Sequence, residues 1–120
     1  MKKLFLLALL LWPLPAHAQQ VIDINKATFT WQDSTAVTEQ VQQFNILCGP
    51  STANYTSSTT VVLAGAGPTY STAVKNVINK PGTYFCNINA QNAVGTSPND
   101  GEINFVGGVA PSTPTAFSIQ

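Results

Sequence analysis

Two cysteines, Cys48 and Cys86, have the most specific chemistry of any residues in this sequence. In an oxidising compartment such an even pair forms a disulfide, whereas elsewhere it could bind a metal or act as a reactive thiol. A structural zinc site takes about four ligands, and no histidine follows His17 to complete one. We therefore favour a disulfide, with a metal site and a reactive thiol as the alternatives.

Acidic residues are the other groups that could do chemistry. Asp100 and Glu102 flank Gly101 and could meet a Ca²⁺ ion, but calcium takes about 6–8 oxygens, and two acids on a turn are typical of a solvated loop. Residues 19–120 contain no histidine, which excludes histidine-based acid–base and triad catalysis there. The glycines of residues 65–67 lack the Gly-Lys-Ser/Thr of a phosphate loop. We expect no enzyme, no catalytic residues, no metal and no cofactor.

Residues 1–18 have the layout of a secretory signal peptide. Two lysines precede an apolar run, and Ala16-His17-Ala18 matches the small-x-small cleavage pattern. The apolar run is shorter than the ~20 residues that cross a membrane, so a membrane anchor is the weaker alternative. We expect cleavage after residue 18, no membrane span afterwards, and a secreted, periplasmic or cell-surface protein. The short Lys-Lys signal looks bacterial.

The remaining residues 19–120 have the length of one domain and carry few charges. Three lysines stand against five carboxylates, with no arginine, for a formal charge of −2. Nucleic-acid binding requires a basic surface for the phosphates, which three scattered lysines do not form. We therefore expect an unidentified protein or glycan as partner, and no nucleic acid.

Short runs rich in Thr, Val, Ile, Phe and Tyr, separated by Gly, Pro, Asn and Ser, predict an all-β protein. Apolar and polar residues alternate within the runs, so each strand has one face to bury, and two sheets packed face to face bury these faces. This predicts a two-sheet antiparallel β-sandwich of about seven strands. The predicted strands are residues 21–24, 26–32, 41–49, 58–64, 69–78, 83–91 and 102–107. The predicted core is Phe29, Trp31, Phe44, Ile46, Val74, Ile78, Tyr84, Ile88 and Phe105.

The segment KPGTYFCNINAQNAVGTS, residues 80–97, resembles a fibronectin type III domain. The family's Pro-Gly turn, tyrosine, alternating apolar positions, alanine, asparagine and final glycine fall on Pro81, Gly82, Tyr84, Cys86, Ile88, Ala90, Asn92 and Gly95. The resemblance covers roughly residues 26–106, with Trp31 in place of the family's second-strand tryptophan. An immunoglobulin domain is the alternative, but there the first cysteine precedes the tryptophan, whereas here Trp31 precedes Cys48. The resemblance implies one immunoglobulin-like sandwich domain over residues 19–108.

The resemblance also implies how the cysteines pair. In this family the third and sixth strands are antiparallel neighbours within one sheet, which places Cys48 nearly opposite Cys86. The disulfide would then join two strands of one sheet rather than the two sheets. Most members of the family lack such a bond, and Cα atoms more than about 7 Å apart would exclude it.

Residues 109–120 form a Pro- and Gly-rich tail in which strand spacing returns. Phe117 and Ile119 alternate with polar residues after Pro111 and Pro114. The segment is similar to the opening strand of a fibronectin type III domain, although it lies at the other end of the chain. Three interpretations stay open: a flexible terminus, a linker into a further domain, and an extra strand that fills a sandwich edge in its own or another molecule.

Binding is the function class that these observations leave. Loops at the ends of a β-sandwich present recognition groups on a rigid frame. The candidate binding residues are Tyr55, Asn92, Val94 and Asp100. We expect an exported, non-catalytic interaction module that binds a protein or glycan through its loops, and an inhibitor would belong to the same class. The alternative is a surface-assembly subunit that self-associates through a strand containing Phe117 and Ile119.

Overall fold

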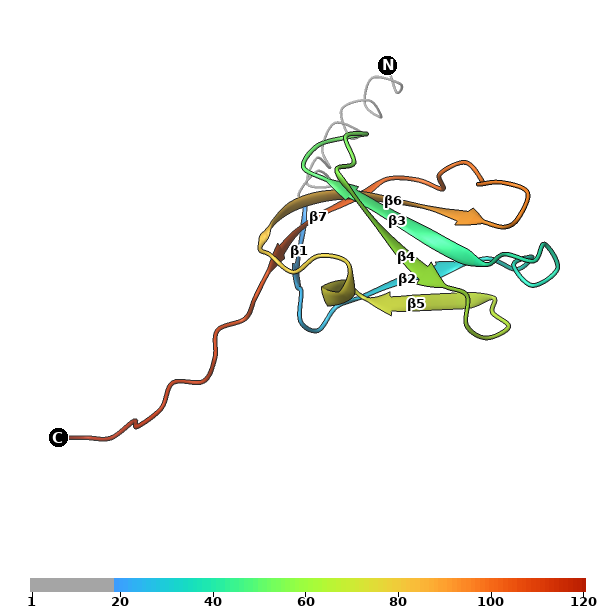
Figure 1. Cartoon of the computed structure of the whole chain (residues 1–120). Coiled ribbons are helices and arrows are strands. Elements are labelled where there is room, and N and C mark those ends of the chain that lie inside the picture. The colour runs from blue at the N-terminus through green and yellow to red at the C-terminus, as the bar shows by residue number, and fades with distance from the viewer. Residues whose placement is uncertain (1–18) are drawn as a thin grey trace, which may run out of the picture.

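The computed structural model describes residues 19–120, so the predicted signal peptide lies outside the described residues. The described residues form seven strands, as expected, and a short 3-10 helix, η2 (Val74–Asn76) (Figure 1). The strands are β1 (Gln20–Asp23), β2 (Thr28–Gln32), β3 (Gln43–Gly49), β4 (Ser57–Val62), β5 (Thr69–Ala73), β6 (Gly82–Gln91) and β7 (Ile103–Gly108). Among the described residues, no helix has the length and apolar character that a membrane crossing requires.

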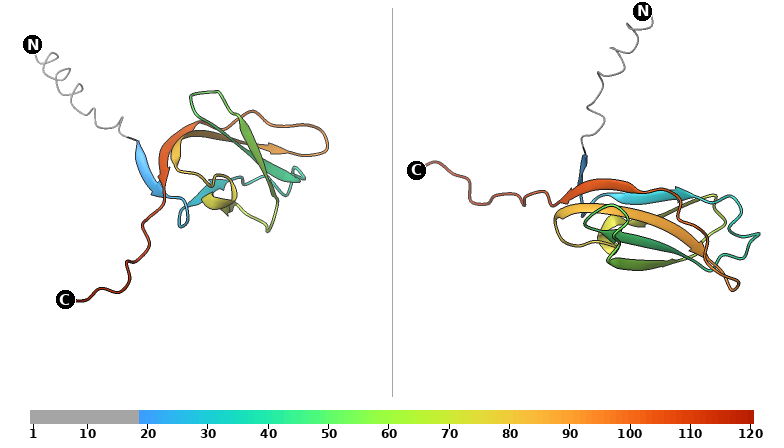
Figure 2. Two further views of the ribbon diagram at one scale, coloured as in Figure 1. Left: turned by 60° about the vertical axis from the view of Figure 1, so that its left-hand side comes forward. Right: turned by 90° about the horizontal axis from the view of Figure 1, so that it is seen from above.

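The strands form two sheets that lie face to face (Figures 1 and 2). One sheet has the order β1-β7-β6-β3-β4 and the other contains β2 and β5. This confirms the all-β sandwich. One pairing differs from the antiparallel expectation, because β1 runs parallel to β7. The tight turn after Asp23 takes the chain directly into the second sheet, so β1 is not held to its neighbour by a hairpin.

Strands β3 and β6 form the centre of the larger sheet. Their register pairs Ile46 with Ile88 and Cys48 with Cys86, so the apolar residues of both strands share the inner face. The buried core lies between the sheets. Its members are Ile24, Ala36, Val41, Phe44, Ile46, Cys48, Tyr70, Val74, Ile78, Cys86 and Phe105. Phe44, Ile46, Val74, Ile78 and Phe105 are thereby confirmed as core residues.

The other predicted core residues are only partly buried. Phe29, Trp31, Tyr84 and Ile88 pack against the core without being enclosed by it. Phe29 and Trp31 lie on β2, whose second edge has no strand partner among residues 19–120, and this leaves their side chains partly open. Tyr84 lies near the start of β6, where its hydroxyl donates a 2.6 Å hydrogen bond to the Lys80 carbonyl.

The predicted strand over residues 69–78 is too long. Strand β5 ends at Ala73, and the chain then turns through η2. The amides of Val77 and Ile78 both bond to the Val74 carbonyl. This turn brings Val74 and Ile78, four residues apart, close together in the same core, whereas in an extended strand their Cα atoms would lie about 13 Å apart.

Candidate functional site

The disulfide joins the two central strands of the larger sheet. Cys48 and Cys86 are directly opposite each other on β3 and β6, with their Cα atoms 4.1 Å apart. The bond therefore joins two strands of one sheet, as the resemblance implies. Both cysteines are at least 98 % buried, which identifies the pair as structural rather than reactive, and a buried disulfide fits an oxidising compartment.

Asn92 organises the turn that follows β6. Its side-chain Oδ1 accepts hydrogen bonds from the amides of Val94 and Gly95 at 2.9 and 3.1 Å, and its own amide donates to the Gly95 carbonyl. Its Nδ2 donates to the Glu39 carbonyl at 2.9 Å. The turn after β6 is thereby joined to the loop between β2 and β3.

The loop between β2 and β3 has internal supports of its own. The Asp33 carboxylate accepts hydrogen bonds from the Thr35 amide and hydroxyl at 3.1 and 3.2 Å. Ala36 is buried, and its carbonyl accepts the Val41 amide. The carbonyl of Glu39 thus belongs to a loop that is folded by hydrogen bonds of its own.

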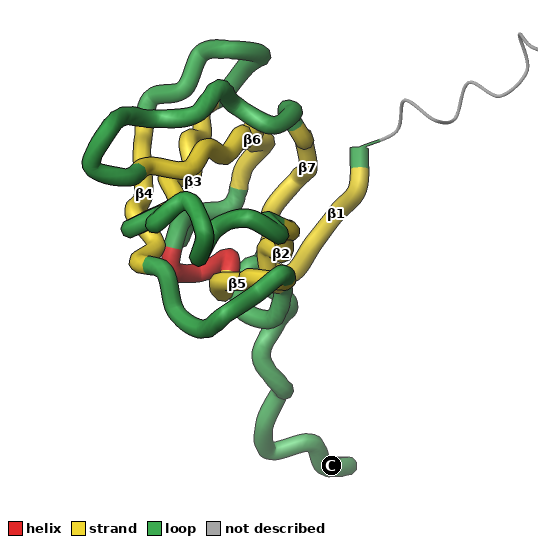
Figure 3. The backbone as a smooth tube through the Cα atoms, turned by 90° about the vertical axis from the view of Figure 1, so that its right-hand side faces the viewer, coloured by secondary structure: helices red, strands yellow, loops and turns green. Residues whose placement is uncertain are grey.

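A hollow of about 490 Å³, which we call the loop hollow, lies between these two loops. Both loops lie at the end of the sandwich that faces the viewer in Figure 3. The lining residues of the hollow are Glu39, Val41, Ala90, Gln91, Asn92, Val94, Gly95, Thr96 and Ser97. The volume falls in the ~300–1,000 Å³ range of ligand sites. Val94 is 95 % exposed at its rim, so two predicted binding residues, Asn92 and Val94, meet here.

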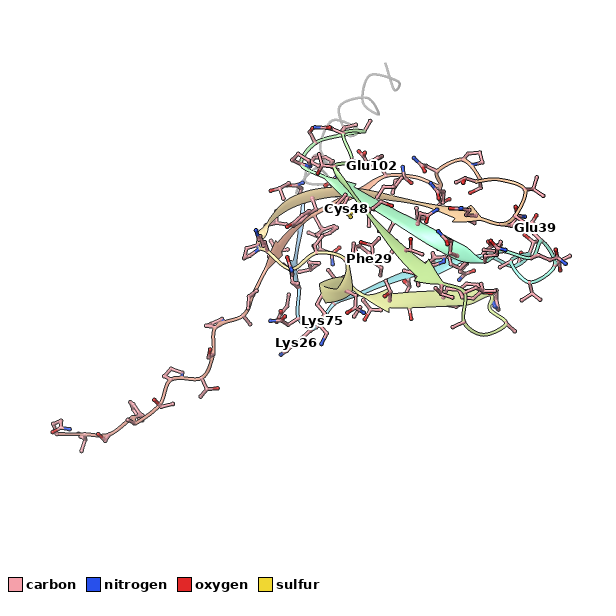
Figure 4. All side chains as sticks on the ribbon, viewed as in Figure 1. Lys26, Phe29, Glu39, Cys48, Lys75 and Glu102 are labelled. Carbon is pink, nitrogen blue, oxygen red and sulfur yellow. A yellow bond between two sulfur atoms is a disulfide. The ribbon has the colours of Figure 1, made fainter. Side chains whose placement is uncertain are left out.

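The other predicted residues lie elsewhere. Tyr55 is on the loop between β3 and β4, where its hydroxyl donates a 2.6 Å hydrogen bond to Oε2 of Glu102. The same oxygen accepts the Ala53 amide at 2.8 Å, and Asn87 donates to the Tyr55 hydroxyl at 3.2 Å. Figure 4 shows Glu102 well away from Glu39 of the loop hollow. Tyr55 is thus part of an internal network.

These hydrogen bonds shift the ionisation of both partners. The bond from Tyr55, and then that from the Ala53 amide, lower the pKa of the Glu102 carboxyl because they stabilise its charged form. The bond to Glu102 raises the pKa of the Tyr55 hydroxyl, since a phenolate could not donate to a carboxylate. The network joins the loop after β3 to the start of β7.

Asp100 does not line the loop hollow, and its side chain makes none of the hydrogen bonds of the Tyr55 network. Its amide donates to the Ile88 carbonyl at 2.9 Å, and the residue lines a groove beside β2. The calcium alternative drew on Asp100 together with Glu102, and Oε2 of Glu102 accepts hydrogen bonds from Tyr55 and Ala53. Within residues 19–120, no three His, Cys, Asp or Glu residues are grouped so that they could hold a metal ion.

The sequence interpretation missed a row of amide side chains on the outer face of β3 and β6. Nδ2 of Asn45 donates to Asn89 at 2.8 Å and to Gln91 at 3.1 Å, and Gln43 donates to Asn45 and Gln91. Alternating amides in both strands signal such a row, but only the register places them side by side. The row ends at Gln91, which also lines the loop hollow.

The tail residues 109–120 lie in no strand and extend away from the sandwich (Figures 1 and 2). Phe117 and Ile119 are 101 % and 94 % exposed. Neither residue therefore packs against the body of its own chain.

Comparison with known protein families and with curated proteins finds no match for this chain.

Proposed function

We propose that this chain is an exported, non-catalytic β-sandwich module that binds a protein or glycan at the loop hollow. The observation that carries this proposal is the hydrogen bond from Asn92 to Glu39, which holds two loops around a hollow with Val94 exposed at its rim. Residues on loops supported by a rigid scaffold are well suited to recognition. The resemblance of residues 80–97 to a fibronectin type III domain, whose loops commonly bind partners, supports the same function.

The lining of the hollow favours an uncharged ligand segment. Amides, hydroxyls and one carboxylate supply hydrogen-bond donors and acceptors, while Val41 and Val94 supply small apolar surfaces. No lysine lines the hollow, so an anionic ligand would meet only the Glu39 side chain as a charge. A neutral glycan or an extended peptide satisfies both kinds of group.

Export is supported by two independent observations. Residues 1–18 have the layout of a signal peptide. The buried Cys48–Cys86 disulfide would persist outside the reducing cytosol. Together they favour a secreted, periplasmic or cell-surface protein.

A glycan array and a displayed random-peptide library, probed with oxidised residues 19–120, test this function. For any ligand selected, Val94→Asp should weaken binding about tenfold or more, because it places a charge at the apolar rim. The matched control is Val21→Asp, since Val21 is also exposed but lies on β1, away from the hollow. Failure of both libraries, or equal binding by Val94→Asp and wild type, would overturn the proposal.

A second candidate function is surface assembly through the tail, favoured by the exposure of Phe117 and Ile119. Light scattering on residues 19–120, beside a chain that ends at Val109, measures it. A concentration-dependent rise in mass that requires the tail supports assembly. A single-chain mass for both proteins at high concentration would exclude it.

A further inference from the structure

One edge of β2 offers backbone groups that no described residue uses. Along the other edge, Val74 donates to the Ala27 carbonyl and Asp33 donates to the Pro68 carbonyl, which sets the phase of the β2–β5 ladder. Because an antiparallel ladder alternates, the N–H and C=O of Phe29 and Trp31 face β5. Those of Thr28, Thr30 and Gln32 face outward, where no hydrogen bond to another described residue is made.

An apolar groove of about 90 Å³ lies beside this edge. It reaches between the sheets to Ile46, Cys86 and Ile88, and Ile103 at the start of β7 lines it with 51 % of its surface exposed. Phe29 and Trp31 line the groove from β2 and are only partly buried. A strand added to β2 would cover these side chains and satisfy the free backbone groups together.

Nothing in the sequence of β2 protects its edge. Proteins usually guard an exposed strand edge with a lysine, a proline or a bulge. The strand reads Thr-Phe-Thr-Trp-Gln, with no charge and no proline, and its pairing with β5 is continuous. The edge is therefore open to a strand of neutral residues.

Residues 116–120 have the properties that such a strand requires. They carry no charged side chain and contain no proline. Phe117 and Ile119 alternate with Ala116, Ser118 and Gln120, so a strand conformation would give one apolar face. With Ser118 opposite Thr30, Phe117 and Ile119 lie on the same face as Phe29 and Trp31, beside the groove.

The length of the tail favours a second copy as the acceptor. Eight residues separate Gly108 from Phe117, and when extended they span about 26 Å, whereas the five residues of β2 span only about 17 Å. A direct return to β2 of the same chain would place Pro111 and Pro114 along that strand, where neither can donate a backbone hydrogen bond. Phe117 would then lie beyond the strand.

We propose that residues 116–120 of one copy add a strand to the free edge of β2 in a second copy, with Phe117 and Ile119 packed against Phe29 and Trp31 along the mouth of the groove. This inference rests on the second candidate function, surface assembly, and assigns its acceptor site. The contact is head to tail, so repetition gives chains or rings rather than a closed two-fold dimer. Strand addition of this kind derives its affinity from backbone hydrogen bonds and its specificity from alternate side chains.

Cross-linking between two variants that each carry one added cysteine, beside the native Cys48–Cys86 disulfide, tests the contact directly. Thr30→Cys in one protein and Ser118→Cys in another should give a mixed disulfide dimer when they are combined under mild oxidation. The matched control replaces Thr30→Cys by Ser71→Cys, because Ser71 is the cross-strand partner of Thr30 on β5 and its backbone faces the opposite edge. Equal dimer yields from the two mixtures would overturn the proposal. So would an intramolecular cross-link in the Thr30→Cys/Ser118→Cys double variant at the expense of dimers.

Light scattering separates the acceptor site from assembly itself. Thr30→Pro removes an outward N–H without touching the β2–β5 ladder, and should reduce the mass to that of one chain, whereas Ser71→Pro should not. If deletion of residues 110–120 abolishes association but Thr30→Pro leaves it unchanged, the acceptor edge is wrong and assembly stands. If wild type never associates, both are wrong. Should Thr30→Pro fail to fold, the cross-linking result decides.

Discussion

Cys48 and Cys86 face each other across β3 and β6 with 4.1 Å between their Cα atoms, although they are 38 positions apart in the chain. The disulfide restricts the conformations of the unfolded chain, and for a loop of this size it should raise the free energy of unfolding by about 2–4 kcal/mol. Urea unfolding should show this difference in stability as a lower midpoint in the presence of a reductant. Identical midpoints would contradict a structural role for the bond.

Glu102→Gln should flatten the acid limb of the stability profile. The folded pKa of Glu102 lies below its ordinary value of 4.5, so its contribution is complete above that value and is lost as pH falls through the folded pKa. Wild type should therefore exceed Glu102→Gln in stability at neutral pH, with the gap closing in acid. Thermal unfolding of both proteins across the acid pH range measures this difference in stability. Tyr55→Phe is the control, because it removes the hydrogen bond that contributes most to the lowered pKa of Glu102. In the Tyr55→Phe background, Glu102→Gln should therefore change the stability at neutral pH by less than it does in wild type.

Phe44→Ala should lower the free energy of unfolding by about 3–5 kcal/mol, the usual cost of deleting a buried aromatic ring. Phe44 is 2 % exposed and its ring centroid lies 5.2 Å from that of Trp31 and 5.0 Å from that of Tyr70. Val62→Ala on β4 is the control, since Val62 is 71 % exposed and should change little. Denaturant titration compares them, and equal losses would mean that the core lies elsewhere.

Gly49→Ala should destabilise the loop that carries Tyr55. A Cβ at residue 49 would overlap the carbonyl of Asn54, which the turn holds against the end of β3. Overpacking of this kind costs about 1–3 kcal/mol. Gly95→Ala provides the comparison, because a Cβ there meets no atom within 4 Å. A thermal midpoint for Gly49→Ala equal to that of Gly95→Ala would show that the loop yields freely.

The alternation of apolar and polar residues predicted several strands correctly. The run of residues 41–49 alternates apolar and polar side chains, and β3 occupies Gln43–Gly49. The same holds for residues 83–91 and β6. Alternation predicts strands because it matches the two-residue period of a strand with one buried face. The predicted strand over residues 69–78 was too long at its end, because the spacing of Val74 and Ile78 suits a turn as well as a strand.

The candidate site was only partly accessible from the sequence. Asn92 and Val94 were identified because a turn after a long strand usually lies at an exposed end of the sandwich. Their partner Glu39 was not identified, since it is 53 positions away from Asn92 in the chain. Tyr55 was selected as an exposed loop aromatic, and its bond to Glu102, 47 residues away, gives it a structural role that exposure patterns do not encode.

The sequence by itself determined the all-β class, the inward faces of the central strands and, through the resemblance, the pairing of its two cysteines. These follow from short-range alternation and from the strand order of a familiar sandwich. Only the tertiary structure shows that β1 pairs in parallel with β7, that Asn92 joins two loops, and that one edge of β2 has no partner among the described residues. Those features depend on which distant segments meet, and a backbone edge is paired or free only once every strand has found its neighbour.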